Sequence, residues 1–140
     1  MEGMMSEGIF KVSKDIVRAK SMIQMANERL NDIIPSFPKD KSYKFIEEYY
    51  EIIVQLITAL MYCDGYKTLG HLELIEYLSK NYNILSNNQI ELIDRLRKFR
   101  HGVVYYGKKV SEEFMANNEE DIKLIITSLN QLVEEKVKDS

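Results

Sequence analysis

The sequence predicts an all-α protein, an antiparallel bundle of about five helices. Three features lead to this fold class. Apolar residues recur at steps of three and four, as they do on the buried face of an α-helix. No segment alternates apolar and polar residues in the manner of a half-buried strand, and no hairpin-type turn separates β-branched runs. Glycine, proline and capping residues stand where these helical segments would begin or end.

The first helix is expected over residues 9–33, where eight apolar positions repeat with the helical period. It is expected to end at Pro35, because proline has no backbone N–H for the helical hydrogen bond. The following connector, residues 35–41, contains the chain's two prolines and mixed charge. This composition is typical of an irregular link between two helices.

The second helix is expected over residues 43–63, with Asp40 or Ser42 as its N-cap. It is apolar on most sides toward its end, which is typical of a helix that other helices surround. We therefore expect it at the centre of the bundle. Gly65 is expected to close it, since glycine readily takes the left-handed conformation found at helix C-termini.

A third, shorter helix over residues 69–81 is expected to start at Thr68. Ser86 and Gln89 have the spacing of a capping box and predict the start of the fourth helix, which should end near Gly107. One side of the fourth helix is apolar and should face the core. This apolar stripe consists of Leu92, Leu96, Phe99, Val103 and Tyr106.

A polar stretch through Asn117 and Asn118 is expected to lead into the last helix. That helix repeats apolar residues at helical spacing, namely Ile122, Ile125, Leu129 and Leu132. The chain is short enough for one core, so residues 1–140 are interpreted as a single domain with its core over about residues 9–135. Residues 1–6 and 136–140 are expected to fray.

The composition narrows the class of protein further. The net charge is −3 and the isoelectric point is about 5.5, which disfavours a protein that coats nucleic acid or anionic membranes through its overall field. Cys63 is the single cysteine, so no intrachain disulfide can form. The longest apolar stretch, residues 52–63, is too short to cross a bilayer. We expect a cytoplasmic protein with no membrane partner.

Residues 95–109 contain six cations, one histidine and two tyrosines, an unusual local excess in an acidic chain. At 100° per residue, five of these side chains fall within roughly 140° of the helix circumference, opposite the apolar stripe. These five residues, here called the basic surface, are Arg97, Arg100, His101, Tyr105 and Lys108. One explanation is purely structural, because cations near a helix C-terminus interact favourably with the helix dipole. Gly102 favours a more specific role, because a mid-helix glycine often allows another backbone to approach closely.

The spacing of Arg95 and His101 resembles the Arg-x(4-6)-His motif of HEPN domains, which are small helical bundles. Residues 49–71 resemble the second helix, glycine turn and helix-opening histidine of that family, and residues 96–107 resemble its arginine helix. The likeness covers about residues 9–135. It implies a homodimer in which the motifs of two subunits meet and cleave RNA as a metal-independent endoribonuclease of toxin type. It implies no cofactor and no metal site.

Two registers of the motif fit the sequence. In the first, Arg95 is the motif arginine and His101 is the base that takes a proton from a ribose hydroxyl, while Arg95 or Arg100 stabilises the developing charge. In the second, Arg100 is the motif arginine and Tyr105 stands in the histidine's place. A phenol has an ordinary pKa of about 10 and is a poor base at neutral pH, so this register predicts an inactive or altered site.

In either register, Arg97 and Lys108 are expected to bind flanking phosphates of RNA or a nucleotide. Two other interpretations are open. The chain is a non-catalytic HEPN module whose partner is a separate small nucleotidyltransferase, or its basic residues pair only with acidic residues such as Glu112 and Glu113. His71 has no second histidine or cysteine at metal-binding spacing, so a structural hydrogen bond is favoured for it.

Overall fold

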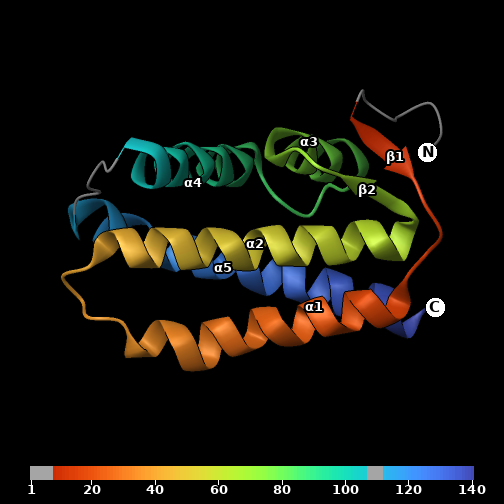
Figure 1. The fold of residues 1–140 in the computed structure, drawn as a ribbon, viewed down its shortest axis with the longest axis horizontal. Coiled ribbons are helices and arrows are strands. Elements are labelled where there is room, and N and C mark those ends of the chain that lie inside the picture. The colour runs from red at the N-terminus through yellow and green to blue at the C-terminus, as the bar shows by residue number, and fades with distance from the viewer. Residues whose placement is uncertain (1–7, 107–111) are drawn as a thin grey trace.

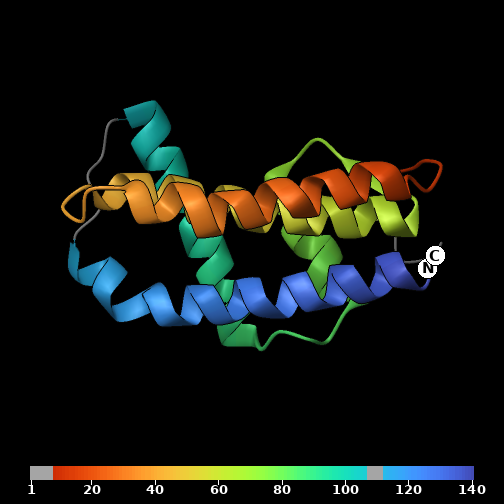
Figure 2. The same cartoon turned by 90° about the horizontal axis from the view of Figure 1, so that it is seen from below.

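The chain folds into five α-helices and a two-stranded sheet in a computed structural model that describes residues 8–106 and 112–140, with only the backbone of residues 104–106. Helices α1 (Ile16–Glu28), α2 (Ser42–Asp64) and α5 (Glu112–Lys138) lie side by side along the long axis (Figures 1 and 2). Helices α3 (His71–Asn81) and α4 (Asn87–Tyr106) pack on α2 and run across it. The predicted helical fold class is therefore confirmed.

The antiparallel arrangement holds for helices joined by short connectors. Helix α1 runs antiparallel to α2, and α3 runs antiparallel to α4 (Figures 1 and 2). Helices α2 and α5, in contrast, run in the same direction (Figure 1). The reason is that α3 and α4 intervene in the sequence and carry the chain back to the end of the molecule where α2 begins.

Helix α2 is the central helix, as its apolar composition predicts. It contacts α1, α3, α4 and α5. Thirteen of its residues are buried, and along its second half the buried positions cover about two thirds of the helix circumference. Its N-terminus differs from the prediction: the cap residue is Lys41 and no side chain caps the helix, while Ser42 is a buried first residue.

Strands β1 (Ile9–Lys11) and β2 (Tyr66–Thr68) pair antiparallel, so the expectation of a chain without strands is wrong in this place. Helix α1 begins and α2 ends at the same end of the bundle, which brings the segment before α1 against the segment after α2 (Figure 1). Three residues per strand are too few for an alternation pattern to be visible in the sequence.

The predicted first helix, residues 9–33, is wrong at its N-terminal end. Asp15 is the N-cap, and its side chain accepts a hydrogen bond of 3.0 Å from the backbone of Arg18, so the helix begins only at Ile16. After Glu28 the chain continues as a π-helical turn over Arg29–Ile33 and a 3-10 turn over Ile34–Ser36. Ile9 and Val12, which precede Asp15, have the helical spacing without being helical.

Three other predicted boundaries are corrected or confirmed. Thr68 belongs to β2, and α3 starts at His71 after the extended Gly70. The capping box is confirmed: Ser86 N–H donates to Gln89 Oε1 at 2.8 Å, and Gln89 N–H donates to Ser86 Oγ at 3.1 Å. Gly107, the expected end of the fourth helix, lies outside the described residues.

Helix α5 is longer than predicted. Asn117 and Asn118 lie inside it, and Asn118 donates from its side chain to the carbonyl of Phe114 one turn earlier. The helix also extends to Lys138, through most of the segment expected to fray, because Lys136 is held by contacts described below. Residues 1–6, the other segment expected to fray, lie outside the described residues.

Gly65 ends α2 in the left-handed conformation that the sequence predicts, with φ of 87°. Its carbonyl accepts a hydrogen bond of 2.9 Å from the N–H of Val12, which joins the end of α2 to the segment before α1. A Cβ atom at this position would lie 3.0 Å from the carbonyl oxygen of Val12. Glycine is therefore required both by the backbone conformation and by the close approach of a second segment.

The Gly65→Ala substitution is expected to lower the free energy of unfolding by about 1–3 kcal/mol, because alanine is strained in this conformation and crowds Val12. Urea denaturation followed by the helical circular dichroism signal measures the change. Ser21→Ala, on the exposed side of α1, is the control and should stay within about 0.5 kcal/mol of the unsubstituted protein. Equal stability of both variants would contradict the strained turn.

Candidate functional site

Helix α4 carries the predicted site, and its apolar stripe fixes the direction of the other side chains. Leu92 and Leu96 are buried in the core. Phe99 packs against Phe114 of α5, with ring centroids 4.6 Å apart. The predicted core-facing stripe is confirmed for these residues. The basic residues of α4 consequently project from its two flanks and its outer side.

The predicted motif arginines lie on different flanks of α4. The guanidinium carbon of Arg95 is 5.0 Å from the ring centroid of Phe114, on the side of α5. The guanidinium carbon of Arg100 is 5.8 Å from the ring centroid of Tyr50, on the side of α2. Each guanidinium therefore lies over an aromatic ring of a neighbouring helix, an arrangement that stabilises a cation and leaves its edge N–H groups able to donate.

Arg97 and Lys98 share one carboxylate of their own helix. Arg97 Nε donates to Asp94 Oδ1 at 2.8 Å, and Lys98 Nζ lies 3.3 Å from Asp94 Oδ2. Burial by itself would raise the pKa of Asp94, but the hydrogen bonds from Arg97 and Lys98 outweigh it and lower the pKa below its usual value. Asp94 is therefore ionised at neutral pH and offsets part of the positive charge of α4.

Arg100 has a looser acidic partner. Its terminal nitrogen is 3.9 Å from Glu51 Oε2, beyond hydrogen-bond distance, and both side chains are one third exposed. The acidic partners of these arginines are thus Asp94 and Glu51. The ion-pairing interpretation named Glu112 and Glu113 as examples of such acids, and the pairs of Arg97 and Arg100 are formed with others.

A tyrosine and a histidine lie beneath Arg100, and the sequence did not reveal their pairing. Tyr50 of α2, 1% exposed, is hydrogen bonded through its hydroxyl to Nδ1 of His71 at 2.9 Å. The two rings are stacked with centroids 5.5 Å apart and an interplanar angle of 22°. The hydrogen bond agrees with the structural role favoured for His71. A spacing of 21 residues between different helices gives no sequence signal for this contact.

The protonation states of this pair follow from its surroundings. Burial raises the pKa of Tyr50 to about 12, although the nearby Arg97 and Arg100 act in the opposite direction. Burial and the charge of Arg100 lower the pKa of His71 below its ordinary value. At neutral pH Tyr50 therefore keeps its proton and His71 is neutral. One nitrogen of a neutral imidazole carries the hydrogen, so Nδ1 either accepts from the Tyr50 hydroxyl or donates to it.

The remaining predicted site residues lie at the C-terminal end of α4. His101 is exposed. Tyr105 is part of the helix, but its side chain lies outside the described residues, and Lys108 lies outside them entirely. The two registers of the motif differ at Tyr105, so both stay open. In the described part of the basic surface, Arg97, Arg100 and His101 come from consecutive turns of one helix.

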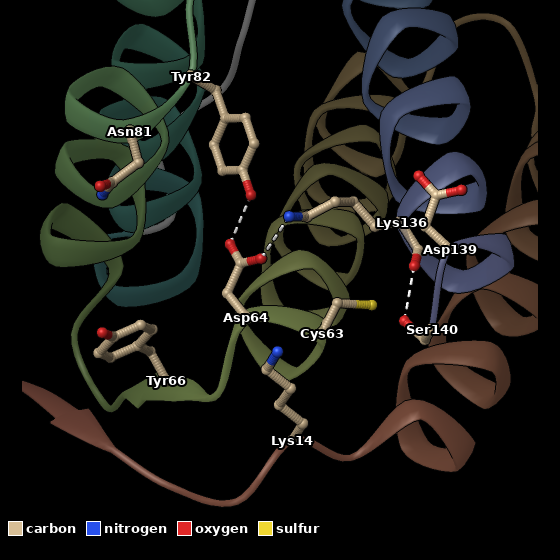
Figure 3. Close-up of a pocket in the computed structure, with 9 residues that line it drawn as sticks. All are labelled: Lys14, Cys63, Asp64, Tyr66, Asn81, Tyr82, Lys136, Asp139 and Ser140. Carbon is tan, nitrogen blue, oxygen red and sulfur yellow. Dashed lines mark hydrogen bonds and ion pairs between the residues drawn. The ribbon is translucent and has the colours of Figure 1, made fainter. Parts of the chain in front are cut away.

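A second polar cluster closes the opposite end of the bundle, around a pocket of about 450 Å³ (Figure 3). Asp64, whose side chain is only 6% exposed, accepts hydrogen bonds of 2.6 Å from the hydroxyls of both Tyr77 and Tyr82. Its other oxygen is 2.9 Å from the ammonium group of Lys136. Asp64 itself belongs to α2, while Tyr77 and Tyr82 lie in α3 and directly after it, and Lys136 lies in α5. The carboxylate therefore holds three parts of the chain together.

The chemistry of this pocket is that of a structural contact. Both oxygens of Asp64 are engaged within the protein. Burial, and then the charge of Asp64, raise the pKa of the Cys63 thiol, which keeps it in the unreactive protonated form. The described residues contain no group of three or more histidine, cysteine, aspartate or glutamate side chains placed to share a metal ion.

In comparisons with known proteins, no family model, no curated protein and no solved structure matches this chain significantly. Within the described part of the chain, every helix is too short or too polar to traverse a lipid bilayer.

Asp64→Asn is expected to lower the free energy of unfolding by about 2–3 kcal/mol, because the amide is neutral and leaves donors of Tyr77, Tyr82 and Lys136 poorly satisfied. Urea denaturation provides the measurement. Asp139→Asn is the matched control, since Asp139 lines the same pocket but is exposed. If both substitutions had the same small effect, the contacts of Asp64 with Tyr77, Tyr82 and Lys136 would not contribute to stability.

The same cluster predicts a loss of stability in alkali. Burial and the hydrogen bond to Asp64 raise the pKa of Tyr82 from its usual 10.0 to about 12, and the hydrogen bond to Asp64 raises the pKa of Lys136 as well. The folded protein therefore holds more protons than the unfolded chain above pH 10, so stability falls as the pH rises from 10 to 12. Urea denaturation across this range should show a shallower fall for Tyr82→Phe. An equally steep fall would contradict the role of Tyr82.

Proposed function

We propose that this protein is a HEPN-like homodimer that binds RNA or a nucleotide through the basic surface of α4, and that it acts as a metal-independent endoribonuclease of toxin type. The observation that carries the proposal is the environment of Arg100. Its guanidinium lies over the buried ring of Tyr50, while the carboxylate of Glu51 is 3.9 Å away. An arginine oriented by a ring and only loosely paired keeps donors for a phosphate.

The charge distribution supports the same proposal. The whole chain has a net charge of −3, yet residues 95–109 contain six cations. Arg97 and Arg100 both lie close enough to act electrostatically on Tyr50 and His71, so their fields overlap at the junction of α2, α3 and α4. A local positive field of this kind favours the phosphates of RNA without attracting anions to the rest of the surface.

The proposed cleavage step uses His101 as a general base. Its imidazole takes the proton of a ribose 2′-hydroxyl, and the oxygen attacks the adjacent phosphorus. The bond from phosphorus to the 5′-oxygen breaks, and that oxygen takes a proton from water. The products are a 2′,3′-cyclic phosphate and a 5′-hydroxyl. Arg95 or Arg100 stabilises the charge on the phosphate during the step, and two subunits supply the complete site.

A second candidate is a non-catalytic HEPN module that partners a separate small nucleotidyltransferase. The observation in its favour is that Arg97 and Lys98 already share Asp94, which withdraws part of the cationic surface from a substrate. This candidate needs no base at position 101. The two candidates therefore differ in the effect of removing His101.

Binding is tested with a fluorescently labelled single-stranded RNA across a range of salt concentrations. Arg100→Ala is expected to weaken binding and to reduce the slope of log affinity against log salt by about 0.7, the contribution of one phosphate contact to a single strand. Lys20→Ala, which removes one positive charge from the exposed side of α1, is the control and should leave the slope unchanged. Equal slopes for both variants would contradict a phosphate contact by Arg100.

Cleavage is tested with the same RNA in the presence of a chelator. The protein should produce cyclic phosphate ends, identified by mass, and His101→Ala should slow the reaction by about 10²–10⁴-fold, as removal of a general base does. Tyr105→Phe separates the two registers, because only the second gives this hydroxyl a role. The absence of cleavage by a protein that sediments as a dimer and binds RNA would favour the non-catalytic module.

A further inference from the structure

The topology brings the start of α3 to the edge of the molecule that carries the basic surface. Helices α3 and α4 run antiparallel across α2, so the N-terminus of α3 and the C-terminal half of α4 lie on the same side (Figures 1 and 2). His71 is the first residue of α3, and Arg100 and His101 lie in the C-terminal half of α4. Residues separated by 29 positions in the sequence are thereby brought to one surface.

We infer that the binding site extends from α4 across Tyr50 to His71, whose Nε2–H group donates a hydrogen bond to a phosphate of the bound RNA or nucleotide. This inference rests on the proposed function and adds a residue outside α4 to it. The ligand class is a phosphodiester or phosphate ester. It is recognised by the guanidinium groups of Arg97 and Arg100 and by the neutral imidazole of His71 as a hydrogen-bond donor.

The contacts form a continuous series. Arg100 lies over the ring of Tyr50, and that ring stacks on His71, which is also hydrogen bonded to the Tyr50 hydroxyl. Because Tyr50 is 1% exposed, it holds both neighbours in place from below. His71 itself is only partly buried, and its ring is held in place by Tyr50, which belongs to the core.

The hydrogen bond to Tyr50 also decides which nitrogen can meet a ligand. In the inferred site the Tyr50 hydroxyl donates to Nδ1, and the hydrogen of the neutral imidazole is on Nε2. Among the described residues, His71 makes its hydrogen bond through Nδ1. The Nε2–H group is thus a directional donor whose proton does not depend on the imidazole becoming charged, beside arginines that supply the charge.

The backbone at the start of α3 is a weaker alternative for the same ligand. Glu73 lies over this helix end: a Cβ atom built on Gly70 would be only 1.8 Å from Glu73 Oε2. A carboxylate from the protein therefore already faces the first turn, where the N–H groups of a helix would otherwise attract an anion. The imidazole and Arg100, rather than the helix end, are left to bind the phosphate.

The first part of the test observes His71 directly. The chain has 2 histidines, so imidazole nitrogen signals in NMR spectra of the full chain are assigned by comparison with His101→Ala. Inorganic pyrophosphate is added at constant ionic strength. The expected result is a protonated-type Nε2 signal in the free protein and a saturable shift of that signal. An Nε2 signal that pyrophosphate leaves unchanged would overturn the inference.

The second part measures RNA affinity of three variants in α3. His71→Leu, which removes both nitrogens, should weaken binding about tenfold, the effect of one hydrogen bond to a charged group. His71→Gln, which keeps an acceptor for Tyr50 and an N–H donor, should recover most of this loss. Ser79→Ala, exposed on the same helix, is the control. Full affinity of a folded His71→Leu protein would overturn the inference and leave the proposed function intact.

The outcomes separate the inference from the function on which it rests. A shift of His71 by pyrophosphate without any RNA binding would uphold the phosphate site and overturn the assignment of RNA as its ligand. Neither a shift nor RNA binding would overturn both. If His71→Leu does not fold, the comparison of His71→Gln with Ser79→Ala and the pyrophosphate titration of the unsubstituted protein still decide the question, because neither needs that variant.

Discussion

Helix α2 must be covered on most sides, and this requirement organises the rest of the molecule. Ile52, Ile57 and Met61 span about half of the helix circumference, and the buried Gln55 and Ala59 extend the buried arc to about two thirds of it. Burial of each large apolar side chain stabilises the fold by about 1.5–3 kcal/mol, so α2 must be covered over most of its circumference. Helices α1 and α5 cover it along its length, while α3 and α4 run across it (Figure 2). The position of the candidate site follows, because residues at the junction of α2, α3 and α4 are brought together by the burial of α2.

The polar groups at the two ends of α3 differ in how many of their hydrogen-bonding atoms are already used within the protein. Near its C-terminal end, the carboxylate of Asp64 is fully used by Tyr77, Tyr82 and Lys136, so the cluster serves to fix helices. Figure 3 shows the contacts of Tyr82 and Lys136. At its N-terminal end, His71 is hydrogen bonded through one nitrogen, and Arg100 is paired only loosely. The first arrangement stabilises the fold on which the second depends, since it anchors α3 against α2 and α5. Incompletely used donors on a rigid support are what a binding site for a phosphate requires.

The sequence was most informative where one physical cause acts locally. Helix α2, the left-handed Gly65, the Ser86 and Gln89 capping box and the apolar stripe of α4 were all predicted, because each depends on neighbours within a turn or on a single backbone conformation. The errors occurred where a distant segment decides the structure. Ile9 has the spacing of a helical residue but belongs to a strand, because β2 lies beside it. The side chain of Lys136 is held, although its charged surroundings predict fraying, because Asp64 reaches it from α2.

The features of the candidate site also fall into those that the sequence predicts and those that depend on tertiary packing. The sequence alone determined that residues 95–109 concentrate positive charge and that their helix has an apolar side, since both are properties of one helix. Only the tertiary structure decided that Arg95 faces Phe114 while Arg100 lies over Tyr50, and that His71 joins the same surface through the Tyr50 hydroxyl. Helical periodicity gives the direction of a side chain around its own axis, but not the ring or carboxylate it meets. Those partners are set by how α3, α4 and α5 pack around α2, which depends on the burial of all of them together.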